Sequence, residues 1–396
     1  MIYAFFAAKG IFMKIVSVVG ARPNFMKVAP FCRALKAYPD VQHILVHTGQ
    51  HYDVRMSEQF FKELDIPNPD INLEIGSGTH AEQVGRTMIA FEKVLKAEKP
   101  DWVVVLGDVN ATCACSITAK KEHIKCAHIE AGLRSRDMDM PEEINRLVTD
   151  RLSDLLLTPD RLSNANLKAE GVPDEKIKFV GNIMIDTLER EREKAAALDI
   201  NAIISENLID EELAAKNAKV AKSVLKDKGY VAMTMHRPSN VDQAETLVPA
   251  MRFFLDEVSK DYPIVWAIHP RAQKMLKEFG LWDEVVANEN MILVKPLGYH
   301  AMLRLNMGAR LFMTDSGGLQ EECCVLGTPC LTMRWNTERP ITLMENGGAS
   351  ILVGNAVDKI REAYKSQIDA ARRPMRPELW DGHTAERIAE CIVKGI

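Results

Sequence analysis

Short runs that are nearly continuous in Val, Ile and Leu recur along this chain and alternate with longer amphipathic segments. Six runs lie in the first half: Lys14–Val19, Gln42–Thr48, Trp102–Leu106, Cys126–Ile129, Leu155–Thr158 and Lys178–Val180. Six more follow: Tyr230–Met235, Pro263–Ile268, Met291–Val294, Arg310–Thr314, Pro329–Met333 and Ser350–Val353. Such runs are typical of parallel strands that helices cover on both faces. We therefore predict an α/β fold of two doubly wound, Rossmann-like domains.

A charged, Ala-rich segment, Glu189–Lys228, separates the two series, and we expect it to be helical. We place the domain change near Asp186, which assigns 14–185 to the first domain and 186–379 to the second. Thr384–Ile396 has the pattern of one amphipathic helix. Residues 1–13 are apolar but short and lack a basic leader, so we interpret them as an extension rather than a secretory signal.

The charge balance and the cysteines exclude several classes of partner. Lys and Arg total 50 against 55 Asp and Glu, which leaves no basic excess for nucleic acid. No uncharged apolar run approaches the roughly 20 residues that span a bilayer. The eight cysteines form no C-x-x-C pair, and the residue types that suit zinc are irregularly spaced: Cys113, Cys115, His123, Cys126 and His128. We expect a cytoplasmic protein with no metal site and with neither nucleic acid nor membrane as a partner.

Unusual residues follow the predicted strands, where ligands bind in open α/β sheets. In the first half these turns are Gly20-Ala21-Arg22-Pro23-Asn24, Gly49-Gln50-His51, Gly107-Asp108 and Glu130-Ala131-Gly132. In the second half they are His236-Arg237-Pro238, His269-Pro270-Arg271 and Asp315-Ser316-Gly317-Gly318. One such turn means little, but seven together indicate a ligand site on each sheet.

The acids of the first half suggest catalysis. Asp108 and Glu130 directly follow two successive strands, so we expect both to enter one crevice. Glu142 follows Pro141, which suits the first turn of a helix. Three carboxylates in one crevice would supply a general base and a general acid. A structural ion pair between Glu142 and Arg146, four residues later, is the alternative.

In the second half, Ser316-Gly317-Gly318 lies between a predicted strand and a helix. Backbone N–H groups and the helix dipole favour an anion there, although Ser316 as a plain helix cap is an open alternative. Arg22, Lys27 and Arg339 have the charge to clamp a diphosphate; the alternative for each is a solvated surface charge.

Missing motifs argue against other enzymes. Neither predicted sheet opens with G-x-G-x-x-G, and no G-x-x-x-x-G-K-[ST] occurs, which disfavours a nicotinamide site and a P-loop. No tyrosine has a lysine four residues later, which argues against the Tyr–Lys pair of short-chain NAD-dependent sugar epimerases. No G-x-S-x-G elbow occurs, which argues against a serine hydrolase.

Several motifs, in order from about Lys14 to Ile396, resemble the non-hydrolysing UDP-N-acetylglucosamine 2-epimerases. In the first half these are Gly20-Ala21-Arg22-Pro23, Gly107-Asp108, His128-Ile129-Glu130-Ala131-Gly132-Leu133-Arg134 and Pro141-Glu142-Glu143-Ile144-Asn145-Arg146. In the second half they are His236-Arg237, Thr314-Asp315-Ser316-Gly317-Gly318-Leu319-Gln320-Glu321-Glu322 and Thr337-Glu338-Arg339-Pro340.

The resemblance implies a glycosyltransferase-B-type architecture with the active site in the interdomain cleft, and a C-terminal helix (380–396) that packs back on the first domain. It implies interconversion of UDP-N-acetylglucosamine and UDP-N-acetylmannosamine without a cofactor, by a homodimer. UDP would leave to give 2-acetamidoglucal and then add back.

The resemblance also implies residue roles. Asp108, Glu130 and Glu142 would be the acid–base carboxylates, and His236 would neutralise charge at the diphosphate. Glu322 would bind the ribose hydroxyls. The remaining UDP ligands would be Arg22, Lys27, Ser316, Gly317, Gly318 and Arg339. In some members a second UDP-N-acetylglucosamine acts as an activator, and its candidate contacts here are Gln50, Arg237 and His269.

The sequence departs from the family pattern at some positions. Val109-Asn110 follows Asp108 where a threonine is common, Pro238 follows His236-Arg237 where many members have an acid, and Asp53 replaces a Gln. His47–Asp53 also resembles a subgroup that epimerises UDP-2,3-diacetamido-glucuronate. Other open readings are a retaining glycosyltransferase, a hydrolysing epimerase and a non-catalytic nucleotide-sugar sensor.

Overall fold

The computed structural model of this chain describes residues 13–49, 60–209 and 225–395 and divides into two compact units. Unit 1 contains the described residues up to Thr187 together with those from Glu378 onward, and unit 2 contains the described residues of Leu188–Pro377. Every helix within the described ranges is too short or too polar to cross a membrane.

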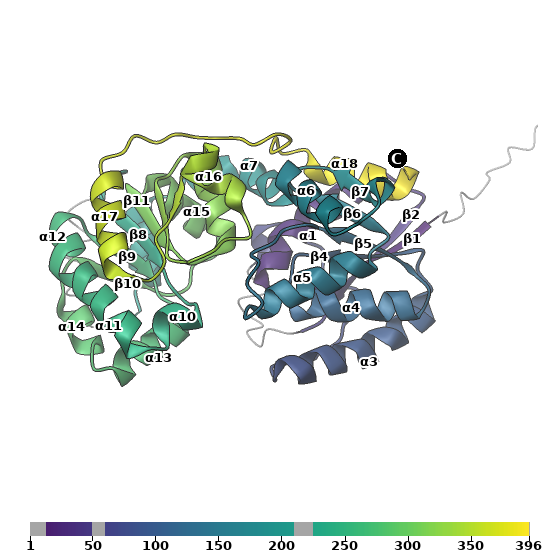
Figure 1. Cartoon of the computed structure of the whole chain (residues 1–396), viewed down its shortest axis with the longest axis horizontal. Helices are drawn as coiled ribbons and strands as arrows, with labels where there is room; N and C mark the ends of the chain where they lie inside the picture. Colours follow the sequence, from purple (N-terminus) through teal and green to yellow (C-terminus); the bar gives the residue numbers. More distant parts are fainter. Residues whose placement is uncertain (1–12, 50–59, 210–224, 396) are drawn as a thin grey trace, which may run out of the picture. The chain divides into compact units, whose positions relative to one another are not determined.

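Unit 1 is built on a parallel sheet of seven strands in the order β3-β2-β1-β4-β5-β6-β7. Its strands are β1 Met13–Val19, β2 Val41–His47, β3 Ile71–Asn72, β4 Trp102–Leu106, β5 Lys125–Ile129, β6 Leu155–Thr158 and β7 Ile177–Phe179. Its helices are α1 Arg22–Leu35, α3 His80–Glu98, α4 Asn110–Lys121, α5 Pro141–Leu152, α6 Arg161–Ala169 and α18 Thr384–Lys394, while α7 Ile183–Ala196 runs on into unit 2 (Figure 1). The strand order reverses between β1 and β4, and ligands of open α/β sheets bind at such switch points.

Unit 2 repeats this arrangement with six parallel strands in the order β10-β9-β8-β11-β12-β13. They are β8 Val231–Thr234, β9 Ile264–Ala267, β10 Met291–Val294, β11 Leu311–Thr314, β12 Cys330–Thr332 and β13 Ser350–Leu352. The α-helices are α8 Ile200–Asn207, α10 Pro238–Val241, α11 Ala244–Phe253, α12 Ser259–Asp261, α13 Pro270–Glu278, α14 Trp282–Ala287, α15 Tyr299–Gly308, α16 Gly317–Leu326 and α17 Val357–Gln367. Here the order reverses between β8 and β11, so each unit has its own switch point.

The predicted fold class is confirmed. Each of the twelve predicted strands forms within one residue of its expected ends, and all the strand pairs are parallel. The sequence prediction missed β3, whose two residues are half-buried and exposed and make no apolar run. The helical expectation for Glu189–Lys228 is only partly right: α7 and α8 are helical, 210–224 lies outside the described residues, and 225–228 ends in a turn at Lys228, whose φ is +63°.

The C-terminal segment is part of the packing of unit 1. Helix α18 packs against α1. Its first N–H groups are satisfied from α7, because the Asp186 carboxylate accepts hydrogen bonds from the backbone N–H of Thr384 (3.1 Å) and of Ala385 (2.6 Å). Trp380 is 1% exposed, and its indole N–H donates to the carbonyl of Pro159 at 2.9 Å. These contacts fix the C-terminal segment to the rest of unit 1 across about two hundred residues of sequence.

Candidate active site

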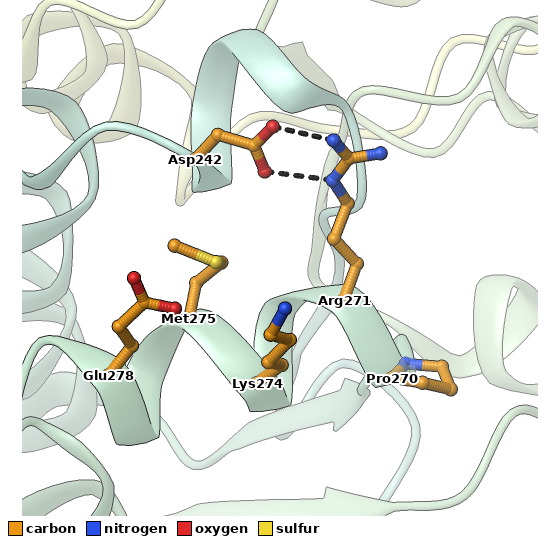
Figure 2. Close-up of a pocket in the computed structure, with 6 residues that line it drawn as sticks. All are labelled: Asp242, Pro270, Arg271, Lys274, Met275 and Glu278. Carbon is orange, nitrogen blue, oxygen red and sulfur yellow. Dashed lines mark hydrogen bonds and ion pairs between the residues drawn. The ribbon is translucent and has the colours of Figure 1, made fainter.

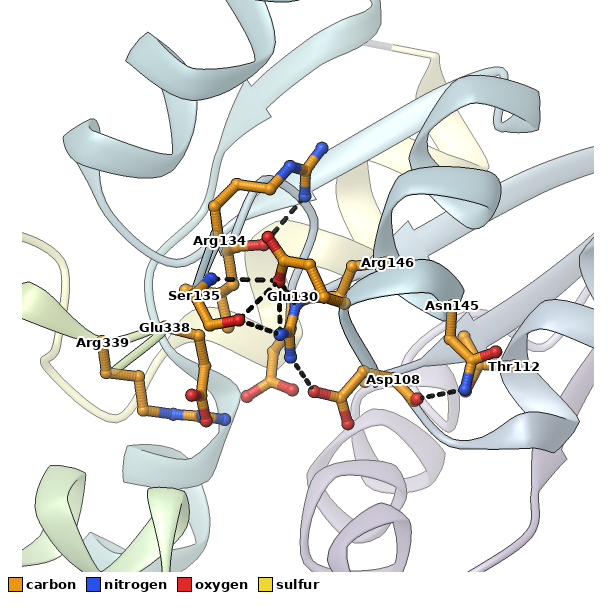
Figure 3. A network of polar contacts seen from close by, with 12 residues as sticks. Asp108, Thr112, Glu130, Arg134, Ser135, Asn145, Arg146, Glu338 and Arg339 are labelled. Carbon is orange, nitrogen blue, oxygen red and sulfur yellow. Dashed lines mark hydrogen bonds and ion pairs between the residues drawn. The ribbon is translucent and has the colours of Figure 1, made fainter. Parts of the chain in front are cut away.

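Asp108 lies at the carboxyl end of β4, directly after a glycine that permits a sharp turn. Gly107 has φ +66°, and a Cβ there would come within 2.8 Å of Lys27 Nζ, so this position needs a residue without a side chain. The Asp108 side chain is 25% exposed and forms an ion pair with Arg146 of α5 (Figure 3). The turn thus presents a carboxylate to solvent with a fixed cation behind it.

Arg146 is buried and links Asp108 to the start of α5. Its Nη2 lies 2.5 Å from Glu143 Oε2, and Glu143 also accepts hydrogen bonds from the backbone N–H groups of Ser135 (3.0 Å) and Arg136 (2.9 Å). Burial opposes ionisation of Glu143, but these donors and Arg146 lower its pKa. The structure thus pairs Arg146 with Glu143, which points inward to hold the loop, whereas Glu142 is half-buried.

Glu130 follows β5, the strand beside β4, and has a left-handed backbone with φ +73°. Its carboxylate forms an ion pair with Lys27 of α1, and the two side chains are 3% and 5% exposed. It also lies against the turn before Asp108, because a Cβ on Gly107 would be 3.4 Å from Glu130 Oε2. The structure thus brings Asp108, Glu130 and Lys27 together, and it gives each of the two carboxylates a cation partner.

Two predicted binding residues of unit 1, Arg22 and Gln50, lie wholly or partly outside the described residues. Arg22 begins α1, but its side chain is outside the described part, and Gln50 lies in 50–59, also outside it. The polar residue of this turn that the structure does describe, Asn24, has a structural role. Its side-chain oxygen accepts from the N–H groups of Gly20 and Ala21, and its amide donates to the carbonyl of Leu106, which joins the end of β1 to the end of β4.

At the switch point of unit 2, His236 and Arg237 follow β8 and meet Asp315, which follows β11. Nδ1 of His236 lies 2.7 Å from Asp315 Oδ1, and the His236 side chain is 42% exposed. The backbone N–H groups of His236 and Arg237 both donate to Asp315 Oδ2 at 2.8 Å. Burial raises the pKa of Asp315, but His236 and the backbone donors outweigh burial and lower that pKa to about 2. Asp315 is therefore a carboxylate that orients the His236 ring.

Ser316, Gly317 and Gly318 open helix α16 next to this pair. Ser316 is the N-cap residue, yet its side chain makes no capping hydrogen bond to the helix, which argues against the plain-cap alternative. A Cβ on Gly317 would lie 2.6 Å from both Arg339 Nη1 and Glu338 Oε1. The helix N-terminus therefore meets a buried charged cluster where only a glycine fits.

Arg339 and Glu322 are both buried in unit 2, in different charge environments. Arg339 Nε lies 2.7 Å from Glu321 Oε1, and Arg339 also pairs with Glu338, so its charge is already shared by two carboxylates. Glu322 faces Tyr299 and Asn306, and burial together with the adjacent charge of Glu321 raises its pKa to about 8.

His269, a predicted activator contact, lies near His236, the residue before the other predicted contact of unit 2, Arg237. The rings of His236 and His269 have centroids 5.6 Å apart, and His269 caps α13 by accepting from the Arg271 N–H at 3.1 Å.

A pocket of about 600 Å³ lies between the end of α10 and helix α13, whose first residue follows His269 (Figure 2). It is lined by Asp242, Pro270, Arg271, Lys274, Met275 and Glu278, and thus by none of the predicted catalytic residues. In the described ranges, no group of three or more His, Cys, Asp or Glu side chains is placed to hold a metal ion.

Sequence reasoning missed the partners of the candidate residues more than the residues themselves. Arg146 and Asp315 stand in the quoted motifs, but their contacts cross from one strand end to another. The i, i+4 spacing drew attention to Glu142, whereas Glu143 makes the contacts. Burial distinguishes these residues in the structure, since Glu143 is 2% and Asp315 0% exposed despite their charge, but no sequence pattern records it.

The two sheets, each with a polar cluster at the carboxyl ends of its strands, define an α/β protein of the glycosyltransferase-B-like class. The profile of the family described as UDP-N-acetylglucosamine 2-epimerase matches residues 33–393. The chain belongs to this family.

Similar proteins and structures agree with that membership. The UDP-N-acetylglucosamine 2-epimerase of Methanocaldococcus jannaschii is 41% identical over 97% of this chain and 100% of its own. Its crystal structure in complex with UDP-GlcNAc and UDP has a TM-score of 0.84, with the same identity and coverage. The UDP-2,3-diacetamido-2,3-dideoxy-D-glucuronate 2-epimerase of Pseudomonas aeruginosa is 36% identical over 96% of this chain and 100% of its own.

Proposed function

We propose that this chain interconverts UDP-N-acetylglucosamine and UDP-N-acetylmannosamine by inverting carbon 2 of the sugar. The observation that carries the proposal is the placement of Asp108 and Glu130 at the ends of neighbouring strands, each held by a buried cation. Two carboxylates at one crevice can remove a proton from one face of a carbon and deliver one to the other face.

The chemistry explains why a nucleotide must leave. The hydrogen on carbon 2 is barely acidic, so a carboxylate alone does not remove it. As the bond from carbon 1 to the UDP oxygen breaks, UDP takes the bonding electrons and the anomeric carbon becomes positive. A carboxylate then accepts the carbon 2 proton, and the remaining electron pair forms the double bond of 2-acetamidoglucal. UDP adds back to carbon 1 while a proton arrives at carbon 2 from the opposite face.

Unit 2 supplies groups that suit the leaving diphosphate. His236 is half-exposed and is oriented by Asp315, so its other ring nitrogen is available to the phosphate oxygens. The N-terminus of α16 offers backbone N–H groups at Gly317 and Gly318. Arg339 adds positive charge in unit 2, as Arg22 and Lys27 do in unit 1, and Glu322 accepts hydrogen bonds from the ribose. Donors placed where negative charge develops lower the barrier to UDP departure.

A second substrate has a specific observation in its favour. The Pseudomonas aeruginosa relative, at 36% identity over almost the whole chain, carries the name of a UDP-2,3-diacetamido-2,3-dideoxy-D-glucuronate 2-epimerase. The same elimination and re-addition would apply to that sugar, because its substituents at carbons 3 and 5 do not take part.

The test is incubation with each UDP-sugar in heavy water, followed by NMR of the sugar. We expect deuterium at carbon 2 of UDP-N-acetylglucosamine and of its epimer, with no NAD added. Turnover without isotope uptake contradicts the proposal. Net release of UDP and free N-acetylmannosamine would identify a hydrolysing epimerase, acceptor-dependent donor loss a glycosyltransferase, and binding without turnover a sensor.

Three further expectations accompany the proposal. We expect a homodimer in the cytoplasm, which light scattering on the purified protein and fractionation of cells test. We also expect a second UDP-N-acetylglucosamine to bind beside the reacting one as an activator, through Gln50, Arg237 and His269. Sigmoidal dependence of the rate on UDP-N-acetylglucosamine would support this, and a hyperbolic dependence would contradict it.

A further inference from the structure

A buried histidine joins the two turns that carry Asp108 and Glu130. His128 lies on β5 and is 0% exposed. Its Nε2 is 2.8 Å from the carbonyl oxygen of Gly107, the residue before Asp108. Its Nδ1 is 2.6 Å from Asp150 Oδ1. The ring therefore has a hydrogen-bond partner at each nitrogen, the Gly107 carbonyl on one side and the Asp150 carboxylate on the other.

Asp150 continues the chain of hydrogen bonds to the second turn. Its Oδ2 accepts from the backbone N–H of Gly132 at 3.0 Å, and Gly132 is two residues after Glu130. Arg134 Nη1 donates to the same oxygen at 2.7 Å. Burial opposes ionisation of Asp150, but His128 and Arg134 outweigh it and lower the pKa of Asp150. An unbroken series of contacts therefore runs from Gly107 through His128 and Asp150 to Gly132.

We propose that His128 and Asp150 are positioning residues, which hold the Asp108 turn and the Glu130 turn at a fixed separation. The inference rests on the proposed function, since it explains how the two carboxylates keep the geometry that proton transfer needs. Neither residue is available to a substrate, because hydrogen bonds within the protein occupy both ring nitrogens of His128 and both carboxylate oxygens of Asp150.

The backbone at Glu130 shows why such a support is needed. Its φ of +73° is one that residues other than glycine rarely adopt and that persists only where the surroundings enforce it. The neighbouring turns at Gly107 and Gly132 have φ values of +66° and +83°. The loop is held at Glu130 by Lys27 and by the N–H groups of Glu130 and Ala131, which donate to the Leu157 carbonyl, and beyond it by Asp150. Loss of the Asp150 contact would allow the turn to relax toward an ordinary conformation and to shift the carboxylate.

The experiment compares His128→Gln and Asp150→Asn with the wild type in the heavy-water assay. A displacement of about 1 Å can lower a catalytic rate by roughly 100-fold, so we expect kcat to fall by about that factor. We expect KM to change by less than about 3-fold and UDP affinity to be retained, since both report mainly ground-state binding. The double variant should be about as slow as either single variant, because the two residues act as one unit.

The matched control is His43→Gln. His43 lies on β2 of the same sheet and bonds Ser17 Oγ at 2.9 Å, so its replacement perturbs the sheet without touching the two turns. We expect it to keep wild-type kcat. An unchanged kcat in folded His128→Gln, an equal loss in the control, or additive losses in the double variant would overturn the inference.

A readout that does not depend on activity separates this inference from the proposed function. Hydrogen exchange at the Gly132 N–H should be faster in His128→Gln and Asp150→Asn than in the wild type and in His43→Gln. If the wild type shows no deuterium uptake at carbon 2, the proposed function fails, whatever the exchange shows. If the wild type is active but Gly132 exchange is the same in all variants, the positioning role fails.

Discussion

Lys27 and Glu130 form an ion pair in which both side chains are almost completely buried, with exposed fractions of 5% and 3%. The pair joins α1 to the end of β5 beneath the Asp108 turn. A carboxylate in such a place depends on its cation, because removal from water without a partner is costly. The pair therefore contributes both to folding and to the charge of the candidate site.

Lys27→Met should leave the Glu130 carboxylate buried and unpaired, and we expect it to lower the free energy of unfolding by about 3–5 kcal/mol. Urea unfolding at pH 7 measures this. Lys14→Met is the control: Lys14 pairs with Glu98 at 3.1 Å, but the side chains are 25% and 30% exposed. An exposed pair contributes at most about 1 kcal/mol. Equal losses in the two variants would contradict the importance of burial.

Asp108→Asn and Glu130→Gln should each lower kcat by about 10²–10⁴-fold, the usual range for loss of a general acid or base. We expect the same of Glu142→Gln, because Glu142 is the third predicted acid–base carboxylate and is half-buried. Asp139→Asn, in an exposed part of the loop before α5, is the control and should keep wild-type turnover. Retention of full deuterium incorporation by Asp108→Asn would exclude it as an acid–base group.

Glu322→Gln should increase stability, and the gain should depend on pH. In the folded protein the pKa of Glu322 is raised to about 8 from a reference of 4.5. The folded state therefore holds this proton more tightly, and the wild type loses stability as pH rises from about 4.5 to 8. Glutamine has no such loss, so the difference in unfolding free energy should grow over this window to at most about 4 kcal/mol.

Urea unfolding of both proteins at pH 5 and pH 8 checks this dependence. Glu278→Gln, at an exposed position of the same unit, should show no comparable trend. A difference between wild type and Glu322→Gln that stays constant with pH would show that Glu322 ionises normally in the folded protein.

Gly317→Ala should disturb the charged cluster at the start of α16. The new Cβ would lie 2.6 Å from both Arg339 Nη1 and Glu338 Oε1. We expect the free energy of unfolding to fall by about 1–3 kcal/mol. We also expect UDP to bind more weakly, which calorimetry measures. Gly85→Ala is the matched control, because Gly85 lies within α3 and no neighbouring atom is within 4 Å of its Cβ position. It should be stabilised by about 0.5–1 kcal/mol.

The sequence predicted the sheets well because their signal is local. A run such as Trp102–Leu106 is buried on both faces, and a continuous apolar pattern records that fact without reference to any distant residue. β3 escaped because it has two residues and depends on pairing with β2 at Val46 and His47. The sequence also predicted which strand ends carry polar residues, because parallel strands place their carboxyl ends at the same edge of the sheet.

The partners of those polar residues were not readable in the same way. Arg146 is 38 residues from Asp108, and Lys27 is 103 residues from Glu130. These pairings follow from the way α5 and α1 cover the sheet, which no local spacing records. The Glu143–Arg146 pair is an example: helical spacing pointed to Glu142 as the alternative partner of Arg146, but Glu143 is the residue that Arg146 and the loop N–H groups of Ser135 and Arg136 bind.

Helix α18 and the residues before it complete a unit whose other parts precede Leu188. On the ribosome, Leu188–Pro377 must therefore be translated between the two parts of unit 1, which takes roughly 10–40 s at ordinary elongation rates. During that time α1 has no α18 to cover it, and Asp186 has no helix end to cap. Unit 2 can finish folding before the last part of unit 1 has been synthesised. The unit that begins first along the chain is therefore the one that is completed last.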